Sequence, residues 1–101
     1  MAQRPKGCKS ATMTADGYVC QDPKNVYALV IEASGATVGD KIALRNGGPT
    51  GAVTLGPITI PATAGMWAIP LGRYGVEFIT SVYYTELVTA AGKVRVTVIY
   101  D

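Results

Sequence analysis

Histidine is absent from this 101-residue sequence, and with it the most common general base and the most common zinc ligand of proteins. A serine or cysteine nucleophile activated by histidine is therefore excluded within one chain. Two cysteines are too few for a closed tetrahedral zinc site, and the sequence contains no phosphate-binding loop of the GxxxxGKS or GxxxxGKT type. From these absences we predict that the chain is not an enzyme and needs neither a metal nor an organic cofactor.

Long apolar runs are also absent. No stretch approaches the roughly 18 uninterrupted apolar residues of a membrane-spanning helix, and the N-terminal residues lack the apolar core of a secretory signal. We therefore expect a soluble protein that is made in a cytoplasm and does not enter a membrane. Cys8 and Cys20 could face each other across an N-terminal hairpin and form a disulfide, but the missing signal favours two reduced thiols.

Charged residues are scarce, at 16% of the chain, and they are unevenly distributed. Residues 1–24 carry four basic and two acidic side chains, whereas residues 25–101 carry five of each, so the net charge of +2 lies near the N-terminus. Affinity for phosphates depends on clustered lysine and arginine side chains. The neutral body of the chain therefore argues against nucleic acid as a partner.

Residues 1–10 are polar and basic and contain one proline and one glycine, which is typical of a flexible arm. Arg4, Lys6 and Lys9 of this arm could contact nucleic acid or an acidic protein surface, or they could be solvated at a frayed terminus. We count these three residues as interface candidates.

Apolar residues make up 49% of the sequence and recur with the two-residue period of strands, not with the 3.6-residue period of helices. Twelve glycines and six prolines provide turns between the apolar segments. We expect strands within residues 25–33, 41–45, 52–60, 66–71, 76–78, 81–88 and 93–100. The pattern predicts an all-β fold, a single antiparallel β-sandwich or jelly roll of six to eight short strands over residues 11–101.

Local signals predict how these strands are connected. Asp16-Gly17 predicts a hairpin between two short β-capable pieces, and Ala90-Ala91-Gly92 predicts a hairpin turn before the last strand. The apolar side chains of residues 52–60 change parity at Gly56-Pro57, which predicts a β-bulge or a corner where the chain changes sheet. Residues 25–33 are apolar on both faces, so we expect this strand to be covered on both sides or partly covered by a partner chain.

Paired carboxylates are the remaining route to hydrolytic chemistry, but the acidic residues of the body are scattered over outward and loop positions. Glu86 shares the parity of Tyr84 and could act as an acid in a pocket. The alternative, which we favour, is a pair between Glu86 and either Lys93 or Arg95 across the terminal hairpin.

Six tyrosines and one tryptophan could form a protein interface or a sugar-binding platform. For Trp67 we favour packing in the core or against another subunit over stacking on a ligand. Tyr83 and Tyr84 are neighbours in one strand and must point to opposite faces, so at least one of them lies outside the main core and is an interface candidate. Ile99, which points outward from the last strand, is a further candidate.

Three segments carry a resemblance to a known group of proteins: GDKIALRNGG (39–48), LGRYGVEFITSVYYTE (71–86) and VRVTVIYD (94–101). They resemble short proteins encoded among the structural genes of tailed bacteriophages, which look like small β-sandwich virion components. The resemblance covers residues 25–101 and does not include the arm with its two cysteines. The matching residues form turns and core, so no functional site is transferred from it.

The resemblance implies a head decoration or cement protein that binds the major capsid protein and stabilises the head. It further implies a homo-oligomer on the capsid surface, with a trimer favoured, that is made in the host cytoplasm. We expect either the basic arm or the loop 46–51 to dock onto the capsid protein. Two alternatives stay open: a glycan-binding or host-attachment module that uses Trp67 and surface tyrosines, and an adaptor at the head–tail junction or on the tail.

Overall fold

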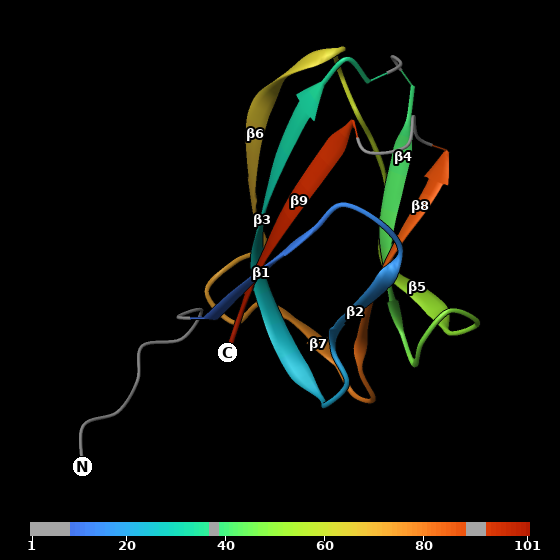
Figure 1. Ribbon diagram of the computed structural model, residues 1–101. Coiled ribbons are helices and arrows are strands. Elements are labelled where there is room, and N and C mark those ends of the chain that lie inside the picture. Colours follow the sequence, from blue (N-terminus) through green and yellow to red (C-terminus); the bar gives the residue numbers. More distant parts are fainter. Residues whose placement is uncertain (1–8, 37–38, 89–92) are drawn as a thin grey trace.

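The computed structural model describes residues 9–36, 39–88 and 93–101, and its strands form two antiparallel sheets that pack face to face (Figure 1). Sheet A has the order β1 (Lys9–Met13), β9 (Val94–Tyr100), β3 (Lys24–Ser34) and β6 (Ala64–Pro70), with β7 (Val76–Phe78) also paired to β3. Sheet B has the order β2 (Gly17–Cys20), β8 (Val82–Val88), β4 (Lys41–Asn46) and β5 (Ala52–Thr59). The predicted all-β sandwich is confirmed, with nine strands in these ranges instead of six to eight. Among the residues that the structure describes, no helix is long and apolar enough to cross a membrane.

Side chains from both sheets meet in one apolar core. The alternation predicted for the last strand holds, because Val94, Val96 and Val98 are buried while Arg95 between them is exposed. The fully buried large side chains are Val26, Leu29, Ile31, Ile42, Leu44, Ile60, Phe78, Val82, Tyr84, Val94, Val96 and Val98. Each contributes roughly 1.5–3 kcal/mol relative to an exposed position, so this interior supplies the main driving force for folding.

The predicted hairpin at Asp16-Gly17 is wrong, because β1 pairs with β9 in sheet A and β2 pairs with β8 in sheet B. Crossing between the sheets lets both short strands cover the core: Met13 packs on it from one sheet and Val19 from the other. Asp16 has a different role at the crossing, since its carboxylate accepts hydrogen bonds from the backbone N–H of Glu86 at 2.8 Å and from the Thr85 hydroxyl at 3.2 Å. Asp16 thus fastens the crossing to β8.

The predicted hairpin between the last two strands is also wrong, because these two strands do not pair with each other. β8 lies in sheet B, whereas β9 lies between β1 and β3 in sheet A, where both its edges are paired. The turn residues 90–92 lie outside the described residues. Glu86 therefore does not face Lys93 or Arg95 across a hairpin; its carboxylate accepts a hydrogen bond from the Tyr84 hydroxyl at 3.1 Å instead.

The parity change at Gly56-Pro57 is a β-bulge, as predicted. Ile42 pairs with Ile58 but Leu44 pairs with Leu55, so two residues of β5 stand opposite one residue of β4. The Gly56-Pro57 peptide bond is cis. β5 is an edge strand of sheet B, where a proline removes no hydrogen bond that the sheet needs.

A second irregularity explains why residues 25–33 are apolar on both faces. The register of β3 against β9 shifts between Val26 and Ala28, so Val26 and Leu29 both reach the core although their parities differ. Ala28 and Val30 then lie half-buried on the outer face of sheet A, where Ala28 is paired with Ile99.

Candidate functional site

Four side chains form a continuous row across the outer face of sheet B. Tyr18 of β2 is paired with Tyr83 of β8, Tyr83 with Arg45 of β4, and Arg45 with Val53 of β5. Residues that pair directly in adjacent strands place their side chains on the same face. The neighbours Val82, Tyr84 and Leu44 point into the core, so Tyr83 and Arg45 point away from it. A register shift between Leu44 and Arg45 brings Val53 opposite Arg45, where its side chain is exposed. We call these four residues the tyrosine–arginine row.

The two tyrosines of the row hold each other in place. Their ring centroids lie 5.0 Å apart with an angle of 86° between the ring planes, an edge-to-face arrangement. Such aromatic pairs contribute about 0.5–1.5 kcal/mol beyond the area that they bury. Tyr18 is nevertheless 44% exposed, so the pair presents an ordered aromatic surface to solvent.

The loop 46–51 between β4 and β5 lies against this row. The Arg45 guanidinium donates a hydrogen bond from Nη1 to the carbonyl oxygen of Gly51 at 2.9 Å. At Gly48, a methyl group would come within 2.6 Å of the Tyr18 hydroxyl oxygen, so the glycine permits the close approach of loop and ring. The row and the loop therefore form one surface.

Asn46 anchors the same loop to the segment before β8. Its side-chain Oδ1 accepts hydrogen bonds from the backbone N–H groups of Thr80, at 2.8 Å, and Ser81, at 3.3 Å. The Ser81 hydroxyl in turn accepts a hydrogen bond from the N–H of Gly47 at 3.2 Å. A loop held this firmly loses little conformational freedom when it binds a partner.

Gly51→Ala is expected to destabilise the loop and lower the free energy of unfolding by about 1–3 kcal/mol. A β-carbon at this position would overlap the backbone carbonyl of Asn46, and backbone atoms cannot swing aside as a flexible side chain can. Thermal unfolding of the variant measures the loss. Thr50→Ala, an exposed change in the same loop, is the control and should leave the midpoint unchanged; equal stability of Gly51→Ala and wild type would contradict the close packing.

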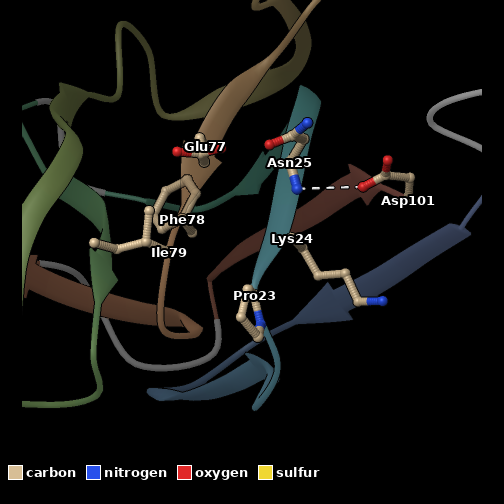
Figure 2. A pocket seen from close by; sticks show the side chains of 7 residues that line it. All are labelled: Pro23, Lys24, Asn25, Glu77, Phe78, Ile79 and Asp101. Atoms are coloured by element: carbon tan, nitrogen blue, oxygen red, sulfur yellow. Dashed lines mark hydrogen bonds between the residues drawn. The ribbon is translucent and has the colours of Figure 1, made fainter.

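A separate cavity of about 380 Å³ lies at the end of sheet A near the C-terminus (Figure 2). Its lining residues are Pro23, Lys24, Asn25, Glu77, Phe78, Ile79 and Asp101. Figure 2 shows Glu77 on one side of Asn25 and Asp101 on the other, so the two carboxylates do not converge on one point.

The Asp101 carboxylate beside this cavity already has donors from its own chain. It accepts hydrogen bonds from the backbone N–H of Asn25 at 3.2 Å and from the Tyr27 hydroxyl at 3.3 Å. These bonds fasten the end of the chain to β3. In the parts of the chain that the structure describes, no three histidine, cysteine or acidic side chains are grouped as a metal site would require. The cavity thus offers neither paired carboxylates nor a metal cluster.

The interface candidates taken from the sequence fall into different places. Arg4 and Lys6 lie outside the described residues, as does Cys8. Lys9 is the first residue of β1 and is exposed at the edge of sheet A. Ile99 is half-buried on the outer face of sheet A.

The aromatic candidates divide into residues of the core and residues of the outer surface. Tyr84 must be removed from the list of interface candidates, because it is fully buried in the core and presents no surface to a partner. Tyr83, its neighbour, is the outward member of the pair. Trp67 packs against the core from β6, opposite Ile31, which agrees with the packing role favoured for it.

Three residues of the row were not among the interface candidates: Tyr18, Arg45 and Val53. Tyr18 and Arg45 sit at outward positions of short strands, but their proximity depends on β2 and β4 lying on either side of β8. The predicted hairpin at Asp16-Gly17 would have placed β2 beside β1 instead. The usable signals in the sequence were the general tendency of tyrosine to form interfaces and the alternation of residues 41–45, which places Arg45 on the face opposite to Leu44.

Comparisons with known proteins return no match: no family model, curated protein or solved structure is similar enough to this chain to inform its function.

Proposed function

We propose that this chain is a structural virion protein of a tailed bacteriophage, which decorates the head by binding the major capsid protein and reinforces the capsid lattice. The resemblance of residues 25–101 to small virion proteins motivates the proposal. The observation that supports a binding role most strongly is the tyrosine–arginine row. Tyrosine and arginine are enriched among the few residues that dominate the energy of protein interfaces.

The surface around the row suits a protein partner. Tyr18 and Tyr83 are rigid aromatic groups, Val53 extends the row to the edge of the sheet, and the loop 46–51 is held beside them by hydrogen bonds. An ordered surface with an aromatic centre loses little entropy on binding, so a modest area can give useful affinity. We propose this row, together with the loop, as the surface that meets the capsid protein.

The proposal is tested by mixing the purified chain with heads that lack it and sedimenting the heads. Tyr83→Ala is expected to weaken binding at least tenfold, equivalent to about 1.4 kcal/mol, because it removes the central aromatic ring of the row. Val53→Asp is also expected to weaken binding at least tenfold, because its carboxylate would lose water when the row meets the capsid protein.

Tyr74→Ala is the matched control, because Tyr74 is 73% exposed and lies outside the row. This variant should bind heads as the wild type does. Failure of the wild-type chain to bind heads would reject the decoration role. Normal binding by both row variants would reject the row as the docking surface while leaving the role itself standing.

The glycan-binding alternative receives no support from the arrangement of the aromatic residues. Trp67 faces the core from sheet A, whereas Tyr18 and Tyr83 point outward from sheet B, so they do not form a common platform. The adaptor alternative would use the same kind of surface. Copy number in purified particles separates the two roles, since a decoration protein covers the head and an adaptor occupies one vertex or the tail.

A further inference from the structure

The strand β6 forms a long uncharged edge of sheet A, visible as the outermost strand of that sheet (Figure 1). Unpaired strand edges pair readily with other chains, and proteins usually protect them by charge, shortness, proline or bulges. The other edge strands have such features: β1 begins with Lys9, β2 has four residues, β5 carries the Gly56-Pro57 bulge and β7 has three residues. β6 has seven residues, no charge and a continuous register with β3, and its one proline, Pro70, stands at its last position.

The hydrogen bonds between β6 and β3 show which backbone groups of β6 face β3 and which face away from it. The N–H of Leu71 donates to the carbonyl of Tyr27 at 2.9 Å, and the N–H of Gly35 donates to the carbonyl of Thr63 at 2.9 Å. In an antiparallel pair the backbone groups of successive residues point alternately to the two sides. Residues with the parity of Thr63 and Leu71 therefore face β3.

Ala64, Met66 and Ala68 have the opposite parity, so their N–H and C=O groups point away from β3. No strand in the described part of the chain pairs with this side of β6. The side chains do not shield the groups either, since two are methyl groups and Met66 is 65% exposed. Three donors and three acceptors are thus presented in strand geometry.

We propose that β6 pairs with β6 of a second copy of this chain, antiparallel about a two-fold axis at Met66. This register places Ala64 opposite Ala68 of the other copy and Met66 opposite Met66, so all six groups find partners. Pro70, which has no N–H, falls outside the paired segment. A two-fold contact brings identical residues together, and β6 is suited to it because no like charges meet.

The contact joins two sheets A into one continuous sheet across the axis. It lies on sheet A, away from the tyrosine–arginine row on sheet B, so both surfaces can be occupied at once. It gives a dimer, whereas the resemblance to virion proteins implies a trimer. The mass of the isolated protein separates these two possibilities, and the result does not depend on the decoration role.

The test is the mass of the full chain by sedimentation equilibrium from low to high micromolar concentration. The wild type is expected to be a dimer. Met66→Lys places two like charges across the axis, and Ala68→Pro removes a donor that only the second copy uses; each should weaken self-association at least tenfold. Ile79→Lys, at an exposed position outside β6, is the control and should remain a dimer.

Amide hydrogen exchange adds a readout that a general loss of stability would not mimic. The N–H groups of Ala64, Met66 and Ala68 should exchange more slowly as concentration rises, and this protection should vanish in Met66→Lys. A wild-type monomer or trimer at high micromolar concentration would overturn the proposal. So would a dimer in which these three amides remain unprotected.

Discussion

Tyr84→Ala is expected to lower the free energy of unfolding by about 3–5 kcal/mol, whereas Tyr83→Ala should lower it by only about 1 kcal/mol. The two tyrosines are adjacent and chemically identical, but Tyr84 is fully buried between the sheets and Tyr83 lies half-buried on the outer face. Truncating Tyr84 leaves a large cavity and removes the donor to the Glu86 carboxylate. Truncating Tyr83 removes the edge-to-face contact with Tyr18.

Urea unfolding of both variants measures these losses, and each variant serves as the control for the other. The same pair also separates folding from binding, because Tyr83→Ala should remain folded while it loses affinity for heads. Comparable losses of stability in the two variants would show that the assignment of one tyrosine to the core and one to the surface is incorrect.

The alternation of apolar side chains predicted much of the fold. In β9 each valine of the sequence VRVTV is buried, as a strand with one face on a core requires. The parity change at Gly56-Pro57 predicted a bulge or a corner between sheets, and the structure has the bulge, in which an extra residue breaks the period of two. These are local properties, which depend on neighbours in the sequence.

The pairing of the strands could not be predicted in the same way. Both predicted hairpins were wrong because β1 and β2 lie in different sheets, and so do β8 and β9. Turn chemistry indicates where a strand ends, but it does not state which strand comes next to it. That choice depends on pairing between residues far apart in the sequence, such as Met13 of β1 and Val96 of β9.

The candidate site could not be predicted in full for the same reason. Tyr83 could be proposed from parity alone, since one of two adjacent strand residues must point outward. Its partners Tyr18 and Arg45 come from strands 65 residues before and 38 residues before it, and they meet only because β8 lies between β2 and β4. A row of side chains built across several strands is therefore visible only once the strand order is known.

Wild-type protein is expected to lose stability above pH 10 more steeply than Tyr84→Phe. Burial raises the pKa of the Tyr84 phenol well above its ordinary value of 10.0, and the charge of Glu86, the hydrogen bond to Glu86 and the charge of Asp16 raise it further. The folded chain then keeps this proton at a pH where the unfolded chain has released it. Since the folded-state pKa is the higher one, the stabilisation is complete below pH 10 and declines as the pH rises above it.

The expected difference is about 1.4 kcal/mol for each pH unit above 10, which is the slope for one proton. At pH 7 the two proteins should differ by only about 1 kcal/mol, because phenylalanine keeps the ring in the core and loses one hydrogen bond. Urea unfolding between neutral pH and about pH 11.5 follows the divergence, since ordinary tyrosines titrate near pH 10. Tyr83→Phe is the control for the loss of a tyrosine hydroxyl outside the core, because Tyr83 lies on the outer face of sheet B. Parallel curves for wild type and Tyr84→Phe would mean that Tyr84 ionises as easily in the folded chain as in the unfolded one, and so that water reaches its hydroxyl beside Glu86.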